Sequence, residues 1–230
     1  MKLSFKEVFK ENKMTLLVSL PENNYEFAKI AWESGADLIK VHINVFHTAS
    51  QNNFGTIESE YKTFTKILKD SPIPVGIVIG NSVELAEESL NRVIDMGFDF
   101  ISLYGFDMPP ILGINRSIET MYAINHTYSL EEIKYTANQN SFDCLEMSVL
   151  PSEKYGTRLN LRNLLKYKAI KESVNVPVVL PTQHLIKEED IKELYWAGID
   201  GLMIGAIVTS KNLAKFKETI MRFRKEINKL

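Results

Sequence analysis

The sequence predicts an α/β fold, a closed (β/α)8 TIM barrel with an extra N-terminal helix, in a single domain that spans residues 1–230. Short β-branched runs alternate with amphipathic helical stretches from end to end, which is the pattern of a parallel sheet covered by helices. Eight such runs occur within 230 residues, close to the length of about 250 residues at which one barrel closes. Several segments also repeat at half the length of such a barrel.

The eight predicted strands share a short length and an apolar face, and a helical pattern follows each of them. They lie near residues 15–20, 37–43, 74–80, 100–104, 120–125, 143–148, 177–182 and 201–205. Three helix starts support this order, because a Ser or Asn stands three residues before a Glu, as in a capping box. The pairs are Ser4 with Glu7, Asn81 with Glu84, and Ser129 with Glu132. The first pair opens the extra helix, which we expect to close the bottom of the barrel.

The internal repeat consists of a Gly-x-Asp pattern that follows a helix and precedes a strand. It occurs at Gly35-Ala36-Asp37, Gly97-Phe98-Asp99 and Gly198-Ile199-Asp200. Each glycine is expected to end its helix in the left-handed conformation. Ile73-Pro74-Val75 also recurs as Val176-Pro177-Val178, so the third and fourth βα units resemble the seventh and eighth. Because four units are half of an eight-unit barrel, we predict a half-barrel internal repeat, in which residues 73–105 superpose on residues 176–205.

The composition argues against several classes of function. A net charge of −2 provides no basic field for nucleic acid, and no apolar run approaches the about 20 residues of a membrane span. The start of the chain, residues 1–7, lacks the apolar core of a signal peptide. The single cysteine, Cys144, suits a reducing compartment. We therefore predict a cytoplasmic protein that binds a small anionic substrate and neither nucleic acid nor a membrane.

Strand parity points to the candidate catalytic residues, because a polar side chain inside a barrel is stable only where the interior opens at the strand C-termini. Lys40 and His42 share the inner face of the second strand, and Glu146 lies on the inner face of the sixth. A buried lysine needs a partner or a depressed pKa, and Glu146 is the natural counter-charge. We predict Lys40, Glu146 and His42 as catalytic residues, with a structural ion pair as the alternative for the first two.

Further polar residues lie at strand ends or in the loop of residues 149–159, which is longer than most βα loops and which we interpret as a lid. The predicted substrate-binding residues are Ser19, Asn81, Tyr104, Asn125, Ser148, Arg158 and Gln183. Within the lid, Arg158 is expected to close over an anionic substrate.

All four histidines lie at or just beyond the predicted strand ends, which in a barrel is the functional face. They are His42, His47, His126 and His184. Imidazoles together with Glu146 or Asp107 could hold a divalent metal ion. No pair of histidines has a diagnostic ligand spacing, so we predict no cofactor and keep a divalent metal as the alternative.

The end of the chain, from Pro177 to Lys217, resembles that of the phosphate-binding (β/α)8 barrels, which include sugar-phosphate epimerases, decarboxylases and aldolases. The residues that carry this resemblance are 178–183, 187–190 and 197–207. N-acylglucosamine-6-phosphate epimerases look nearest in size and in this ending. The resemblance implies that Thr182, Gly205 and Ala206 bind phosphate, with backbone N–H groups at a short helix N-terminus. It also suggests a homodimer.

Two departures limit what the resemblance implies. Pro181-Thr182-Gln183 stands where such barrels usually have a glycine-bearing phosphate turn, and the third strand ends in Gly80-Asn81 in place of the epimerase lysine. A catalytic lysine would therefore have to be Lys40, on a different strand. The activity of one particular family does not transfer residue by residue.

Together, these observations predict an enzyme of carbohydrate metabolism that acts on a small phosphorylated metabolite, a sugar phosphate or a similar compound. The reaction would be proton transfer or C–C cleavage beside a carbonyl group, as in an isomerase or epimerase, or in an aldolase or other lyase. One alternative is a barrel that binds a metabolite without converting it. Another is a metal-dependent hydrolase or lyase that uses the histidines at the strand ends.

Overall fold

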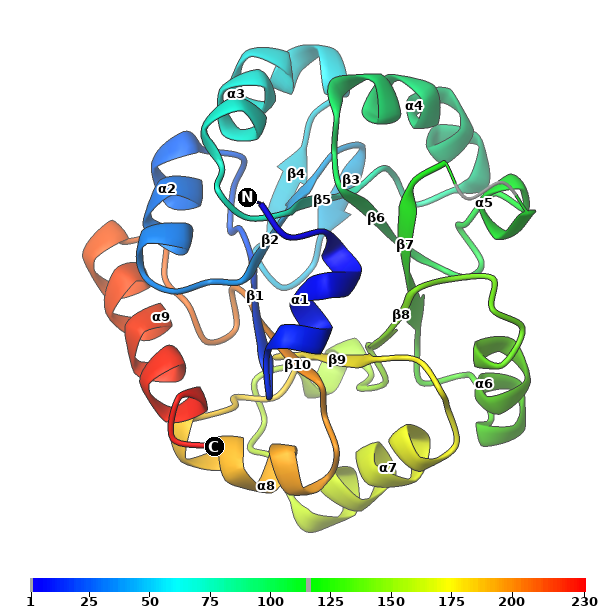
Figure 1. Ribbon diagram of the computed structural model, residues 1–230, viewed down its shortest axis with the longest axis vertical. Coiled ribbons are helices and arrows are strands. Elements are labelled where there is room, and N and C mark those ends of the chain that lie inside the picture. Colours follow the sequence, from blue (N-terminus) through cyan, green and yellow to red (C-terminus); the bar gives the residue numbers. More distant parts are fainter. Residues whose placement is uncertain (1, 115–116) are drawn as a thin grey trace.

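A computed structural model describes residues 2–114 and 117–230, and it shows a closed barrel of eight parallel strands surrounded by helices (Figure 1). The barrel strands are β1 (Thr15–Ser19), β2 (Leu38–His42), β5 (Val75–Val78), β6 (Phe100–Tyr104), β7 (Glu119–Ile124), β8 (Cys144–Met147), β9 (Val178–Pro181) and β10 (Gly201–Ile204). Each overlaps one of the predicted strands. The predicted TIM barrel is therefore confirmed.

One helix precedes the first strand, and the others follow strands around the barrel. They are α1 (Phe5–Glu11), α2 (Tyr25–Glu33), α3 (Ile57–Asp70), α4 (Val83–Met96), α5 (Ile111–Ile114), α6 (Leu130–Ala137), α7 (Leu161–Glu172), α8 (Ile191–Trp196) and α9 (Leu213–Ile227), with 3-10 turns η1 (Ser152–Lys154) and η2 (Glu188–Asp190). In the described part of the chain, none of these helices is both long and apolar enough to cross a membrane.

The helix starts follow the sequence closely, with one exception. The capping boxes of Ser4 with Glu7 and of Ser129 with Glu132 are both present. The predicted box at Asn81 is wrong, because the N-cap of α4 is Ser82, whose side chain accepts a hydrogen bond from the Leu85 backbone N–H. Ser82 has the extended backbone that an N-cap requires, with φ −155° and ψ 160°.

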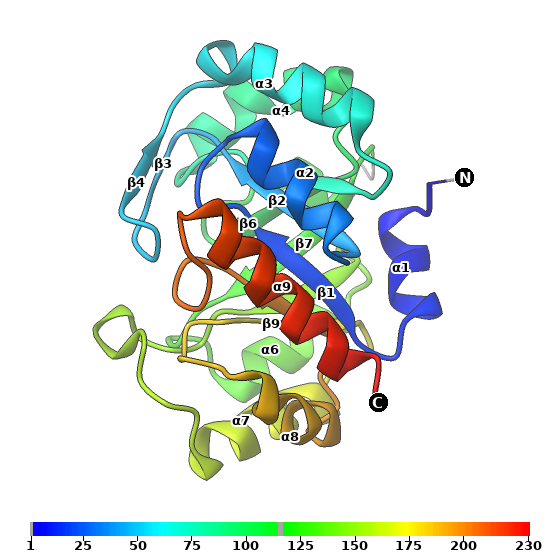
Figure 2. The same ribbon diagram turned by 90° about the vertical axis from the view of Figure 1, so that its left-hand side faces the viewer.

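Helix α1 closes the N-terminal end of the barrel, as predicted. Its Phe5 is fully buried and stacks on Phe100 of β6, with ring centroids 4.3 Å apart. The other side chains of this inner cluster include Leu17, Met121 and Cys144. In Figure 2, α1 lies across one end of the barrel, and the β3–β4 hairpin described below lies at the other end. The open end is therefore the C-terminal end of the strands.

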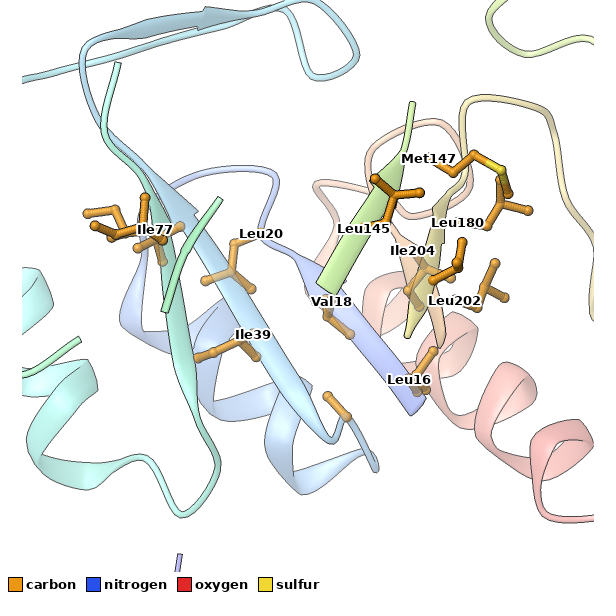
Figure 3. Close-up of a cluster of buried hydrophobic side chains, with 14 of the residues drawn as sticks. Leu16, Val18, Leu20, Ile39, Ile77, Leu145, Met147, Leu180, Leu202 and Ile204 are labelled. Atoms are coloured by element: carbon orange, nitrogen blue, oxygen red, sulfur yellow. The ribbon is translucent and has the colours of Figure 1, made fainter. Parts of the chain in front are cut away.

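The apolar side chains between the barrel and its helices form a second layer of core. Leu16 and Val18 of β1, Ile39 of β2 and Leu145 of β8 belong to this layer (Figure 3). Neighbouring positions along the same strands alternate with them and face the barrel interior, as a period of two requires. This alternation sends Lys40 and Glu146 inward.

Aspartates before alternate barrel strands form a recurring contact. Their carboxylates accept hydrogen bonds of 2.7 to 2.8 Å from a backbone N–H of the preceding barrel strand; the pairs are Asp37 with Leu16, Asp99 with Val75, Asp143 with Thr120 and Asp200 with Val178. The contacts of Asp99 and Asp200 precede strands β6 and β10, which are half a barrel apart. Those of Asp37 and Asp143 precede β2 and β8, so the pattern recurs every two strands. The superposition of the two halves itself stays a prediction.

The predicted left-handed glycines are confirmed, and a left-handed asparagine precedes a fourth aspartate. Gly35, Gly97 and Gly198 have φ angles of 101°, 85° and 83°. Before Asp143 the left-handed residue is Asn140, with a φ angle of 57°, and it stands three positions before the aspartate instead of two. Asn is among the few residues besides Gly that adopt this conformation. The fourth case therefore differs from the Gly-x-Asp pattern in both residue type and spacing.

A two-stranded hairpin after β2 was not predicted. Its strands, β3 (Val45–His47) and β4 (Asn52–Phe54), pair in antiparallel orientation. Each strand has only three residues, too few for an alternating pattern to be visible in the sequence. Phe54 stacks on His42 at a centroid distance of 4.7 Å, so the hairpin packs against the open end of the barrel.

Candidate active site

The C-terminal ends of the strands surround a cavity of about 450 Å³. Most of the residues predicted for the site line this cavity, and they are Ser19, Lys40, His42, Asn81, Tyr104, Glu146, Ser148, Thr182, Gln183, Gly205 and Ala206. The structure therefore brings together residues from strands β1, β2, β6 and β8 and from the segments that follow β5, β8, β9 and β10.

An ion pair between Lys40 and Glu146 crosses the barrel interior. Their strands, β2 and β8, are four strands apart in both directions around the barrel, yet Lys40 Nζ lies 2.8 Å from Glu146 Oε2. The two residues are only 4% and 6% exposed. Both groups line the cavity, so a molecule reaches the pair of charges by entering from the open end of the barrel.

Two serines complete the surroundings of the Glu146 carboxylate. Ser102 donates a hydrogen bond of 2.8 Å to Oε2, and Ser148 donates one of 3.0 Å to Oε1. Burial by itself raises the pKa of Glu146, but the charge of Lys40 and the hydrogen bonds from Lys40, Ser102 and Ser148 outweigh it, so the pKa lies below its ordinary value. Glu146 is therefore an ionised carboxylate at neutral pH, held in one orientation.

His42 and His47 lie beside this ion pair and are both neutral at pH 7. Burial, and then the neighbouring His47 and Lys40, lower the pKa of His42 well below its ordinary value. Burial, and then the charge of Lys40, lower the pKa of His47 to about 4. His47 Nδ1 lies 2.7 Å from Ser50 Oγ, whereas His42 Nδ1 has no hydrogen-bond partner among the described residues. His42 thus lines the cavity with a hydrogen-bonding capacity at Nδ1 that the described residues do not use.

The depressed pKa of His47 predicts that the protein loses stability in mild acid. The unfolded chain binds a proton at this side chain below a pH of about 6.5, but the folded chain binds it only near pH 4. The stability that neutral His47 contributes to the folded protein is therefore fully present above pH 6.5, and it is lost as the pH falls from 6.5 towards 4. We expect the urea midpoint to be lower at pH 5 than at pH 7.5, and the difference to be smaller in His47→Asn. An equal difference in the two proteins would contradict this assignment.

Aromatic side chains line the mouth of the cavity. Tyr104 stacks on Phe106 with a centroid distance of 5.1 Å and an interplanar angle of 6°, and burial raises the pKa of Tyr104 above its ordinary range. Phe46 of the unpredicted hairpin and Tyr155 of the lid also line the cavity. Sequence reasoning did not select Phe46 and Phe106, because an aromatic residue in a short loop has no periodic signal.

The turn predicted to hold phosphate is present but differs from the expected form. Gly205 and Ala206 line the cavity, and the Gly205 N–H donates a 3.1 Å hydrogen bond to Thr182 Oγ1. A single turn follows, in which Val208 and Thr209 both donate to the Gly205 carbonyl oxygen. A short helix was expected here, but the next helix, α9, begins only at Leu213.

The lid segment is tied to the cavity by Gln183. The Gln183 side chain accepts a 2.9 Å hydrogen bond from the Leu150 N–H and donates one of 2.8 Å to the Tyr155 hydroxyl. This segment extends from the same end of the barrel as the β3–β4 hairpin (Figure 2). The predicted lid thus carries one side chain, Tyr155, into the cavity wall.

The structure does not place two of the predicted residues in this cavity. Arg158 forms a bidentate ion pair with Asp190, at 2.7 and 2.9 Å, because Asp190 presents both carboxylate oxygens to it. Asn125 accepts hydrogen bonds from the backbone and side chain of Thr127 and forms a local turn. Neither side chain lines the cavity, so the expected approach of Arg158 to a substrate there is not seen.

The four histidines do not form one cluster. His42 and His47 line the cavity described above, whereas His126 and His184 line a different one. Within residues 2–114 and 117–230, no three His, Cys, Asp or Glu side chains are grouped so that they could hold a metal ion. A metal bound jointly by His42 and His184 is therefore not supported by the geometry.

Comparisons with known proteins match at the level of the fold. No family model and no curated protein sequence matches the chain. Among solved structures, a thiamine phosphate pyrophosphorylase from Pyrococcus furiosus is 20% identical with a TM-score of 0.65, and the match covers 96% of this chain and 98% of that one. A phosphoribosylanthranilate isomerase from Thermotoga maritima is 16% identical with a TM-score of 0.64, covering 94% and 100%. A tryptophan synthase structure from Mycobacterium tuberculosis is 12% identical with a TM-score of 0.70, covering 97% and 98%.

At these identities the likeness shows the fold alone. The chain is a (β/α)8 barrel of the kind found in these enzymes, as its final segment suggested.

Proposed function

We propose that this protein is an enzyme that moves a proton beside the carbonyl group of a small phosphorylated metabolite. The observation that carries the proposal is the buried Lys40–Glu146 pair in the cavity wall. A buried ion pair contributes little stability compared with apolar side chains of similar volume. Its position at the open end of a barrel, where active sites of this fold lie, favours a chemical role.

The proton transfer divides naturally between the two groups. The Glu146 carboxylate is the base that accepts the proton from the carbon beside the carbonyl. The Lys40 ammonium group donates a hydrogen bond, and then a proton, to the carbonyl oxygen as negative charge develops there. Ser102 and Ser148 hold the carboxylate in place. Return of the proton to the other face of the carbon, or to the neighbouring carbon, completes an epimerisation or an isomerisation.

Carbon–carbon cleavage through an imine is the second reaction considered. It requires Lys40 as a free amine, and the 2.8 Å contact with an ionised carboxylate favours the ammonium form. Proton transfer is therefore the reaction that we propose, and imine formation is a distinguishable outcome of the test.

The phosphate group would bind at the turn of Gly205 and Ala206, beside Thr182. All three residues line the cavity, and the names of two of the enzymes with the same fold refer to phosphate compounds. Within this proposal the enzyme belongs to cytoplasmic carbohydrate metabolism, works without a cofactor, and forms a homodimer.

The test is deuterium exchange into candidate substrates. The protein is incubated in D₂O with triose, pentose, hexose and N-acylhexosamine phosphates, and proton NMR follows the signal of the hydrogen beside the carbonyl. We expect one compound to lose this signal at a rate proportional to the protein concentration. The exchange should be absent with the Glu146→Gln variant. A parallel incubation with borohydride should trap no adduct on the protein.

Each other result has a defined meaning. A lysine adduct after borohydride treatment would replace proton transfer with imine chemistry. Binding of a compound without exchange would instead indicate a metabolite-binding barrel. The hydrogen bond from Gly205 N–H to Thr182 is the observation that favours this second function, because it occupies one of the donors expected for phosphate.

A further inference from the structure

A second cavity, of about 410 Å³, lies between the lid and the start of helix α7. The lid contributes Leu150, Lys154 and Thr157 to its wall, and α7 contributes Arg162 and Lys166. His184, the residue after Gln183, also lines it. None of the functions proposed above uses this cavity.

The charge of the cavity wall is strongly one-sided. Lys154, Arg162 and Lys166 line it, and no Asp or Glu does. None of the three cations forms an ion pair with any residue in the ranges 2–114 and 117–230. Burial, and then the charge of Arg162, lower the pKa of Lys166. An anion in the cavity would relieve this repulsion.

The N-terminus of α7 adds donors of the same kind. The helix runs from Leu161 to Glu172, and the side chain of its N-cap, Asn160, accepts a hydrogen bond from the Asn163 N–H. The first backbone N–H groups of a helix have no partner within the helix, and its dipole favours negative charge at this end. Asn160, Arg162 and Asn163 all line the cavity, so it lies at this helix end.

His184 provides an independent sign of a missing ligand. It is 2% exposed, and its Nδ1 lies 3.0 Å from the Thr157 carbonyl oxygen. Because a carbonyl oxygen can only accept, Nδ1 carries the hydrogen and neutral His184 has its acceptor lone pair on Nε2. This Nε2 is buried without a hydrogen-bond partner in the described part of the chain. A buried polar atom of this kind is normally satisfied, and a ligand in the cavity that His184 lines would satisfy it.

We propose that this second cavity binds a phosphomonoester group, separately from the barrel mouth. The phosphate oxygens would contact Arg162, Lys154 and Lys166 together with the N-terminus of α7. A hydroxyl group of the ligand, or the P–OH of a phosphate monoanion, would donate to His184 Nε2. The site does not depend on the reaction proposed above.

The position of this site connects it with the lid. Leu150 lines the second cavity and Tyr155 lines the first, and the side chain of Gln183 binds both of them. A ligand that orders the segment from Leu150 to Thr157 would therefore also hold Tyr155 in the active-site wall. Occupancy of the second cavity would in this way favour the closed lid.

Histidine NMR tests the proposal on the intact chain. Inorganic phosphate and glycerol phosphate are titrated at constant ionic strength set with chloride, and the four imidazole signals are assigned from single His→Gln variants. We expect both ligands to shift the signal of His184. The affinity should fall by about tenfold or more in Arg162→Gln. It should stay unchanged in Lys168→Gln, which removes a cation from the same helix outside the cavity.

The proposal is overturned if phosphate shifts only the His42 and His47 signals, or if Arg162→Gln and Lys168→Gln bind it equally. A failure of the proposed reaction leaves these signals unaffected, so the two proposals fail separately. Arg162 is exposed, which makes loss of folding an unexpected result in that variant. Lys154→Gln, on the lid, serves as a second variant with the same expected loss of affinity.

Discussion

Turnover of the exchanging substrate is expected to fall by about a hundredfold or more in Lys40→Met. Methionine has a similar volume but no proton to donate to the carbonyl oxygen, so the enolate that forms beside Glu146 loses its stabilising charge. Lys40→Arg should not restore the rate, because a guanidinium group remains protonated and does not fit the geometry of an ammonium group. The measurement is the rate of deuterium incorporation at saturating substrate. A rate near that of the wild-type protein would show that Lys40 is structural.

The same variant requires a control for folding. Lys40→Met leaves the Glu146 carboxylate buried beside two serines without its cation, and loss of one partner of a buried pair costs about 3–5 kcal/mol of unfolding free energy. We expect the double variant Lys40→Met/Glu146→Leu to recover most of this stability and to remain inactive. Urea unfolding followed by circular dichroism measures the stability, and deuterium incorporation measures the activity. If the double variant is no more stable than the single one, the charge of Glu146 is not the cause of the loss.

The substitution Gly76→Ala is expected to lower the free energy of unfolding by about 1–3 kcal/mol or more, through overpacking at the closed end of the barrel. A Cβ atom at this position of β5 would lie 2.1 Å from the Phe100 ring. The ring cannot retreat easily, because Phe5 of α1 stacks on it with ring centroids 4.3 Å apart. Urea unfolding at pH 7.5 measures the effect, far from the acid range in which His47 titrates.

A compensating variant makes this prediction specific. Phe100→Leu removes the ring that a Cβ at position 76 would meet, so Gly76→Ala should cost much less in the Phe100→Leu background than in the wild-type protein. This difference is the coupling energy of a double-mutant cycle. Additive effects of the two substitutions would show that the close approach of position 76 to the ring does not limit stability.

The site illustrates how far strand parity reaches. Lys40, Glu146 and Ser148 were selected from the sequence, since a period of two assigns a face to each residue of a strand. Arg158 was selected from a loop, where no such period exists, and Asn125 from the predicted end of a strand that stops at Ile124. Both make contacts outside the cavity. Phe46 reaches the cavity wall through a hairpin whose strands are too short for a visible pattern. Loop residues are positioned by contacts distant in sequence, and local patterns do not contain that information.

The sequence by itself determined the eight-stranded barrel, the helix that closes it, the left-handed helix ends and the inward direction of Lys40 and Glu146. All of these follow from local periodicity, capping and backbone conformation, which depend on residues a few positions apart. Only the tertiary structure decided that Lys40 and Glu146 meet, 106 positions apart in the chain, across the barrel at 2.8 Å. Only the tertiary structure shows that His42 and His47 line one cavity and that His126 and His184 line another. The same is true of the ion pair between Arg158 and Asp190. These contacts form because the closed barrel and its loops bring distant segments of the chain together. Packing and charge between residues far apart in the sequence determine each contact, and local patterns do not contain this information.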